Sequence, residues 1–298
     1  MYKPKHCSPK KKSKGRSCLN NSLLKKIVNI LNKNYKCNLD TGKSQNNIYN
    51  NICKKIKEIS DCENEACWSS LDVIKKGLSD NDYRNFVNSF RPFMPEKWKE
   101  NPGTWLNTND IDNVLNQYKE KYDFFEYPGA IPIDFDKKTD SGSCMVNDIC
   151  KIDVKSLLNN KKCMGVVFNT DPHNSSGQHW FSIYIDLVGK NMKNKPTIYY
   201  FDSVAEDPQQ EIVEFVQKLQ GQFKDMGKEL DVVYNDIKHQ YENTECGVYS
   251  IHFITSMLKG MQFRNYVNNI NSARQMREMR NIFFVSDVIL VSPDDISR

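Results

Sequence analysis

The sequence predicts an α+β fold, in which a mixed sheet is flanked by helices and preceded by an N-terminal helical arm. Three observations carry this prediction: apolar stripes at helical spacing in the first third, short apolar runs after residue 160, and an apolar segment over residues 246–258. A chain of 298 residues, 39% hydrophobic and 27% charged, can bury a full core.

The first 18 residues are expected to form a disordered basic tail. Residues 1–16 carry six lysines and Arg16 without an acid, a charge of +7. The whole chain sums to +5, so the remainder sums to −2. Such a tail is typical of solubilising or targeting segments, and weak nucleic-acid contact is the alternative.

Residues 19–100 are expected to form the helical arm. After a capping cluster at residues 20–22, five apolar side chains form one helical stripe: Leu23, Leu24, Ile27, Ile30 and Leu31. A second stripe follows through Ile48, Ile52, Ile56 and Ile59, and SSLDVIKKGL and DYRNFVNSF indicate shorter helices. The prolines and glycine of FRPFMPEKWKENPGTW place a boundary near residue 100.

Residues 101–298 are expected to form a second domain built on the sheet. A capped helix is predicted in WLNTNDIDNVLNQYKEKY, followed by strands at 163–170, 180–188 and 197–203. DPQQEIVEFVQKLQGQF predicts a helix with Asp207 as its cap and Pro208 at its first position. LDVVYNDI predicts another strand, and CGVYSIHFITSML a buried helix. Because strands and helices alternate imperfectly, a mixed sheet is expected.

The ten cysteines are expected to be mostly free thiols. No apolar region follows the N-terminal charges and no run approaches a membrane span, so a reducing compartment and no membrane contact are predicted. Four residues separate Cys62 from Cys67 and five separate Cys144 from Cys150, with no histidine pair to complete a zinc-finger spacing. We therefore expect neither a metal nor a cofactor.

Cys246 is the candidate nucleophile. If the buried helix begins there, its amide groups and dipole would stabilise a thiolate, and Gly247 would let a substrate backbone approach. A structural thiol is the alternative. A nucleophilic cysteine also needs a base and a group to orient that base.

His179 is the best candidate base, because it opens a strand directly after a glycine-containing loop. His252 lies within the apolar helix and is expected to be a core histidine. Asp186 shares a strand with His179 but would lie roughly 23 Å away on the other face. Asp202 closes the next strand, and would lie beside His179 if the two strands are antiparallel. Gln240 and Asn243 are alternative side-chain donors to an oxyanion.

His179, Asp202, Gln240 and Cys246, in this order, resemble the active site of the ubiquitin-like-protein-specific protease and adenovirus protease clan of cysteine peptidases. HWFSIYID, IYYFDS and TECGVYSIHFI are similar to its histidine strand, aspartate strand and cysteine helix. FNTD, GQHW and TECG further resemble polyprotein-processing proteases of large cytoplasmic DNA viruses such as African swine fever virus. Those sequences carry Gln at the position of Asn243 and Asn at that of Asp202.

The resemblance implies a Cys-His-Asp thiol endopeptidase, with Gln240 or Asn243 as the oxyanion donor. Segment WLNTNDIDNVL is similar to a groove-lining segment of the clan, so Trp105, Asn107, Trp180 and Gly247 are the expected substrate contacts. The implied substrates are viral structural polyproteins cut after Gly-Gly or Ala-Gly, in the host cytoplasm and the virion. Removal of ubiquitin-like proteins such as SUMO is the alternative, and acetyl transfer a more distant one.

Overall fold

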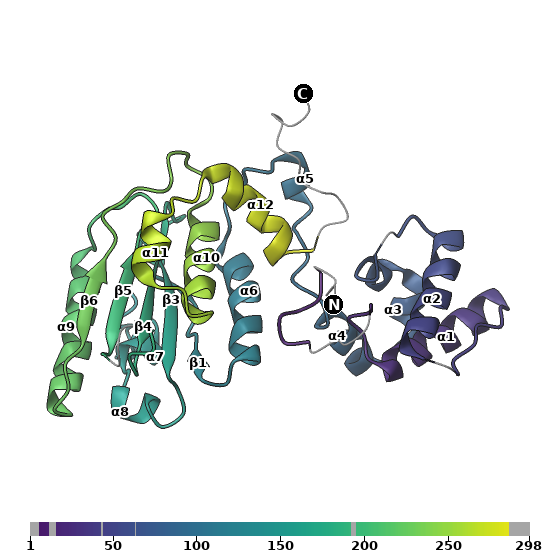
Figure 1. Ribbon diagram of the computed structural model, residues 1–298, viewed down its shortest axis with the longest axis horizontal. Coiled ribbons are helices and arrows are strands. Elements are labelled where there is room, and N and C mark those ends of the chain that lie inside the picture. The colour runs from purple at the N-terminus through teal and green to yellow at the C-terminus, as the bar shows by residue number, and fades with distance from the viewer. Residues whose placement is uncertain (1–5, 12–15, 43, 63, 192–194, 286–298) are drawn as a thin grey trace. The chain divides into compact units, whose positions relative to one another are not determined.

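The computed structural model describes residues 6–11, 16–42, 44–62, 64–191 and 195–285 (Figure 1). The chain folds into two compact units, one of Met1–Glu100 with Asn281–Arg298 and one of Asn101–Arg280. The division after Glu100 coincides with the boundary expected from the sequence. The described residues 281–285 belong to the first unit, and not to the second as the sequence analysis assumed.

The first unit is helical, as the apolar stripes predict. Asn20 caps the first helix by accepting a hydrogen bond from the amide of Leu23, and Ser44 caps the second in the same way. Most of both stripes, including Ile27 and Ile52, is fully buried in one core, and Ile30 and Ile59 pack against it partly buried. The elements are α1 Asn21–Tyr35, α2 Gln45–Ile59, the 3₁₀ helix η1 Cys67–Ser70, α3 Asp72–Gly77, α4 Asp80–Val87 and α5 Lys97–Glu100.

The basic N-terminal segment is not a disordered tail where the structure describes it. Cys7 and Cys18 are buried and joined by a disulfide, and the amide of Ser8 donates to the carbonyl of Ser89. The prediction failed because it weighed the lysines and ignored the two apolar sulfurs between them. Residues 1–5 and 12–15 lie outside the described residues.

The expectation of mostly free thiols is also wrong for this structure. Disulfides join Cys7 to Cys18, Cys62 to Cys67, and Cys144 to Cys150. Cys37, Cys53, Cys163 and Cys246 are free. Pairing depends on which side chains the fold brings together, and the spacing of cysteines in a sequence does not report it.

The second unit is built on a six-stranded sheet, which is mixed, as the sequence predicts. Its strands follow the order β1-β3-β4-β5-β6, with β2 also paired to β3. β4 is antiparallel to both β3 and β5, whereas β1 and β2 run parallel to β3, and β6 runs parallel to β5. The strands are β1 Phe125–Glu126, β2 Ala130–Pro132, β3 Cys163–Asn169, β4 Trp180–Asp186, β5 Thr197–Phe201 and β6 Asp231–Tyr234.

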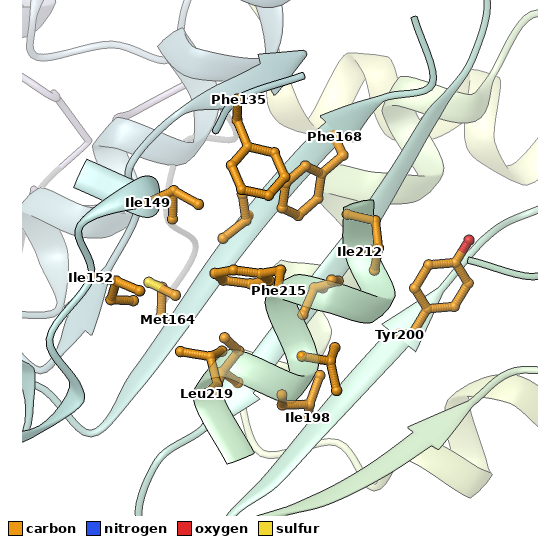
Figure 2. Close-up of a cluster of buried hydrophobic side chains, with 14 of the residues drawn as sticks. Phe135, Ile149, Ile152, Met164, Phe168, Ile198, Tyr200, Ile212, Phe215 and Leu219 are labelled. Carbon is orange, nitrogen blue, oxygen red and sulfur yellow. The ribbon is translucent and has the colours of Figure 1, made fainter. Parts of the chain in front are cut away.

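Helices cover both faces of the sheet, which explains why β3, β4 and β5 are buried along their whole length. On one face, Phe215 and Leu219 of α9 pack against Met164, Phe168 and Ile198 (Figure 2). The other face carries α10, which packs on β3 and β4 and against α6. The remaining helices are α6 Thr108–Lys121, α7 Asn147–Cys150, α8 Val154–Leu157, α9 Gln210–Asp225, α10 Cys246–Leu258, α11 Phe263–Asn268 and α12 Ala273–Phe283.

Two local features refine the sequence predictions. Helix α9 begins at Gln210 with Gln209 as its cap, so Asp207 and Pro208 precede it instead of capping it. A Cβ atom on Gly165 of β3 would lie 2.9 Å from Ile254 Cγ2, so glycine there lets α10 approach the sheet closely. Among the described residues, no helix is both long and apolar enough to cross a membrane.

Candidate active site

The sheet register brings His179 and Asp202 together. β4 and β5 are antiparallel, with Ser182 opposite Phe201. His179 directly precedes β4 and Asp202 directly follows β5, so both lie at the same end of the strand pair. The antiparallel arrangement is the condition under which the sequence predicted this meeting. Asp186 pairs with Cys163 and Thr197 at the opposite end of β4.

His179 and Asp202 form a nearly symmetric contact. His179 Nε2 lies 3.0 Å from Asp202 Oδ1 and 3.1 Å from Oδ2. The His179 side chain is 17% exposed and that of Asp202 is 2% exposed. Because one carboxylate holds Nε2 through both oxygens, Nδ1 is the ring nitrogen left to serve a nucleophile.

Asp202 is itself held in place by neighbouring backbone and side-chain groups. Its amide donates to Asn235 Oδ1 at 2.8 Å, and Asn235 Nδ2 donates to the Asp202 carbonyl at 2.7 Å. The amide of Val204 donates to Asp202 Oδ1 at 2.7 Å. These contacts fix both the backbone and the carboxylate, so that the carboxylate can in turn fix the imidazole.

Cys246 is the first residue of α10 and is buried. A side chain at this position lies at the positive end of the helix dipole, where the first amide groups of a helix have no partner within it. The preceding Glu245 forms a fully buried ion pair with Arg280, whose Nε lies 3.0 Å from Glu245 Oε2. Arg280 also donates to the carbonyls of Thr104 and Thr244, so one guanidinium braces the loop before Cys246.

The thiol and the carboxylate act on the same imidazole. Burial favours the neutral ring, but hydrogen bonding and charge from Asp202 and Cys246 outweigh it and raise the pKa of His179 to about 10. The three groups therefore form one electrostatic unit.

Gln240 and Asn243 occupy different environments. Gln240 is buried, and its Oε1 accepts a hydrogen bond of 2.7 Å from the Ser203 hydroxyl, which leaves Nε2 as the free end of the amide. The amides of His239 and Gln240 both donate to the Ser203 carbonyl, which ties this loop to the turn after Asp202. Asn243 is exposed in the bend before Cys246.

Three of the four predicted substrate contacts line one pocket of about 360 Å³. Trp105, Asn107 and Trp180 contribute to it, together with Gly177. Trp180 is anchored by a hydrogen bond from its Nε1 to the Leu106 carbonyl, whereas Trp105 is 40% exposed. The Asn107 side chain also caps α6 by accepting from the amide of Asp110.

Gly247 serves a packing role that the sequence analysis did not foresee. It is buried, and a Cβ atom there would lie 3.0 Å from Leu106 Cβ. The structure therefore gives a reason for glycine other than the approach of a substrate backbone: the segment that follows Trp105 lies directly against the start of α10.

The other histidines have partners of their own. His252 bonds Tyr266, and burial lowers its pKa to about 4, in agreement with the predicted core role. His239 bonds the Val267 carbonyl, and its burial also lowers its pKa. His173 pairs with Asp134, and His6 with Glu65.

Sequence reasoning missed the groups that hold the site in place. Ser203, Asn235, Glu245 and Arg280 were not singled out. An acid directly before Cys246, in the otherwise apolar surroundings of α10, was an available signal for a buried ion pair. Its partner lies 35 residues further along the chain, and no local pattern identifies it.

A thiol at a helix start, paired with an imidazole that a carboxylate orients, is the arrangement of a cysteine protease, and comparisons with known proteins agree. Residues 132–289 match the Ulp1 protease family, C-terminal catalytic domain. The match spans more than half of the chain, which therefore belongs to the Ulp1 protease family and is a cysteine protease.

Similar proteins come from large DNA viruses. A protein described as a thiol protease of Acanthamoeba polyphaga mimivirus is 30% identical over 198 residues, which cover 66% of this chain and 60% of the mimivirus protein. The SUMO-1 cysteine protease of an African swine fever virus isolate is 24% identical over 246 residues, covering 76% and 85%. The crystal structure of the African swine fever virus protease shares the fold, with a TM-score of 0.73 at 19% identity, covering 95% of this chain and 97% of that one.

Proposed function

We propose that the protein is a viral thiol endopeptidase that works through Cys246, His179 and Asp202. The observation that carries the proposal is the hydrogen-bonded His179–Asp202 pair, whose imidazole is also under the influence of the Cys246 thiol. The Cys246 thiolate attacks the scissile carbonyl carbon, and the imidazolium of His179 gives its proton to the leaving amine. The neutral imidazole then takes a proton from water, which hydrolyses the thioester and releases the acid product.

The oxyanion that forms in each step needs donors placed in advance. The amide of Cys246 is one, and Gln240 Nε2 is the other. The bond from Ser203 to Gln240 Oε1 supports this choice, because it holds the amide with its NH₂ group free. Exposed Asn243 lacks the burial that strengthens an electrostatic contact.

The proposed substrates are structural polyproteins of a virus, cut after small residues in Gly-Gly-Xaa or Ala-Gly-Xaa sequences. The pocket lined by Trp105 and Trp180 is the proposed groove for these substrate residues. We further propose that the protease acts in the host cytoplasm and is packaged into the virion. Contact between the basic N-terminal residues and nucleic acid stays a prediction.

A deconjugase of SUMO or other ubiquitin-like proteins is the second candidate. It is favoured by the name of the African swine fever virus relative, a SUMO-1 cysteine protease. The chemistry would be the same, and the substrates would differ in whether a folded protein must be bound beside the groove. Acetyl transfer by the same thiol is a weaker alternative, because nothing in the site favours it over hydrolysis.

The experiment compares short peptides with folded reporters. The purified chain and its Cys246→Ala variant are incubated with fluorogenic peptides carrying Gly-Gly and Ala-Gly, and with ubiquitin-like fusion reporters. Cys163→Ala is the matched control, because Cys163 is also a buried free thiol, but one whose pKa burial raises to about 11.

Peptide cleavage that disappears in Cys246→Ala and persists in Cys163→Ala is the expected result. Cleavage of folded reporters alone would establish the deconjugase instead. Undiminished cleavage by Cys246→Ala would refute the assignment of the nucleophile. A folded parent chain that cleaves none of these substrates would refute the proposed activity.

A further inference from the structure

A second cluster of reactive side chains lies in the first unit and has no part in the proposed catalysis. The ligand atoms of His6, Cys7, Cys18 and Glu65 all lie within 4.8 Å of one another. Cys7, Cys18 and Glu65 are buried, and His6 is partly buried. Among the residues that the structure describes, only this group gathers three or more such side chains at this range.

Glu65 is the centre of the cluster. Its carboxylate accepts hydrogen bonds from the Ser17 hydroxyl at 2.6 Å and from the amide of Cys18, and His6 Nε2 lies 3.2 Å from Oε1. The Glu65 side chain is fully buried, and a buried carboxylate needs a cation nearby. Ser17 and the Cys18 amide hold it in the way that outer groups orient the ligands of a metal.

The donor set matches the preference of zinc. Two thiolates, an imidazole nitrogen and a carboxylate oxygen are all ligands of tetrahedral Zn²⁺, with bonds of about 2.0–2.3 Å that place the donors about 3.3–3.8 Å apart. The widest separation here, 4.8 Å, exceeds that by about one ångström. Small side-chain movements therefore suffice, once the two sulfurs are no longer bonded to each other.

We propose that the reduced chain binds one zinc ion through His6, Cys7, Cys18 and Glu65, and that the zinc site and the Cys7–Cys18 disulfide are alternative states of this cluster. A dithiol reductant converts the disulfide into two thiols and becomes a cyclic disulfide itself. Zinc binding then displaces the two thiol protons into solvent, while Glu65 binds as the carboxylate and His6 as the neutral ring.

The proposal differs from the sequence expectation of no metal for a specific reason. The four ligands come from residues 6, 7, 18 and 65, so they form none of the short paired spacings by which zinc sites are recognised. In either state the cluster joins three segments of the chain. These are the N-terminal residues with His6 and Cys7, the segment with Cys18 that precedes α1, and the loop with Glu65 that precedes η1. Reduction without metal would release these segments and expose the sulfurs of the first-unit core.

The test uses the full chain with the Cys246→Ala substitution, so that the reactive thiol cannot contribute a ligand. The protein is reduced with a phosphine, loaded with Zn²⁺ and passed through a desalting column, and its zinc is counted by mass spectrometry. Co²⁺ loading adds a spectroscopic readout, since thiolate-to-cobalt absorption reports sulfur ligation. We expect one zinc per chain, thiolate–cobalt absorption, and a higher Tm for the reduced chain with zinc than without it.

Matched variants locate the metal. Cys7→Ser with Cys18→Ser should abolish both signals, whereas Cys62→Ser with Cys67→Ser, which removes a different disulfide of the same unit, should retain them. Glu65→Gln keeps the size of the side chain and should weaken zinc affinity at least about tenfold. A reduced, folded parent that retains no zinc would overturn the proposal, as would zinc that survives the loss of Cys7 and Cys18. If the Cys7/Cys18 double variant fails to fold, zinc binding by the parent, by the Cys62/Cys67 variant and by Glu65→Gln still tests the proposal.

Discussion

The second unit contains two histidine–aspartate pairs with similar geometry and different surroundings. His173 Nδ1 lies 2.7 Å from Asp134 Oδ2, and His179 Nε2 lies 3.0 Å from Asp202 Oδ1. The His173 side chain is 35% exposed against 17% for His179, and Asp134 is 15% exposed against 2% for Asp202. A short histidine–aspartate contact is thus not sufficient to define an active site.

The two histidine–aspartate pairs differ in their burial and in whether a third group, a thiol, interacts with the histidine. Asp202 receives fixed hydrogen bonds from the amide of Val204 and is locked by Asn235, and its histidine also interacts with a thiol at a helix start. Asp134 and His173 instead fasten a loop at the pocket rim, where the amide of His173 also donates to Asp134. In the proposed mechanism the first pair orients a base, whereas the second holds a loop.

The largest difference between the two pairs should be seen in kcat/KM when each histidine is replaced in turn. His179→Ala removes the base and the proton donor, so we expect kcat/KM on the peptide to fall roughly 10³-fold. His173→Ala should change it by no more than about threefold, since a loop contact is lost and no reacting group. Steady-state kinetics of both variants, with circular dichroism to show that each is folded, makes the comparison. Equal losses would mean that the rim pair takes part in catalysis.

The next largest effect should come from the turn that follows Asp202. Gln240→Ala removes an oxyanion donor, and we expect a fall in kcat of roughly 10²-fold. Ser203→Ala should show a smaller loss, about tenfold, because Gln240 keeps its NH₂ group but loses the hydrogen bond that orients it. Asn243→Ala is the control and should be near neutral. If Asn243→Ala is the most damaged of the three, the donor has been misassigned.

Asp202→Asn should lower kcat roughly tenfold to a hundredfold and shift its pH dependence. Asp202 and Cys246 raise the pKa of His179 to about 10 against the opposing effect of burial, so the parent should lose activity as pH rises through about 10. Removing the carboxylate charge lowers that pKa, and the alkaline limb should therefore move to lower pH. Asp134→Asn should leave the limb in place. If the loss of activity at high pH occurs at the same pH in Asp202→Asn as in the parent, a group other than the His179–Asp202 pair determines it.

The same raised pKa links the His179–Asp202 pair to folding stability. A histidine with a folded pKa near 10 and an ordinary value of 6.5 contributes stability that is fully present below about pH 6.5 and is lost as pH rises through about 10.

The smallest expected effect is on stability at the rim. The His173 pair lowers the pKa of Asp134 despite some opposing burial, so its contribution is present above the ordinary value of 3.8 and is lost as pH falls below it. The pair is partly exposed and screened, so Asp134→Asn should cost no more than about 1 kcal/mol at neutral pH. Urea denaturation of the parent and the variant measures the difference. A cost several times larger would mean that the loop is part of the core.

The sequence alone predicted many of the helices and strands, and it supplied the candidate site residues. Stripes such as Leu23 to Leu31 and the run before Asp202 are signals within a few residues, and the hydrophobic periods that they follow are set by local backbone geometry. The choice of Asp202 over Asp186 as the partner of His179 also needed only the length of a strand and the alternation of side chains between its two faces. The start of α9 was misplaced by two residues, because the sequence analysis took Pro208 as its first residue and Asp207 as its cap, whereas the helix begins at Gln210 with its cap at Gln209.

Tertiary structure decided what depends on contacts between distant residues. The antiparallel register places Asp202 beside a histidine 23 residues earlier, and the fold brings the Ser203 hydroxyl to Gln240 Oε1. The disulfides, the Glu245–Arg280 pair and the cluster around Glu65 likewise join side chains that no local pattern connects. The physical reason is that periodicity reports which face of an element is buried, whereas packing of the whole chain determines which buried groups meet.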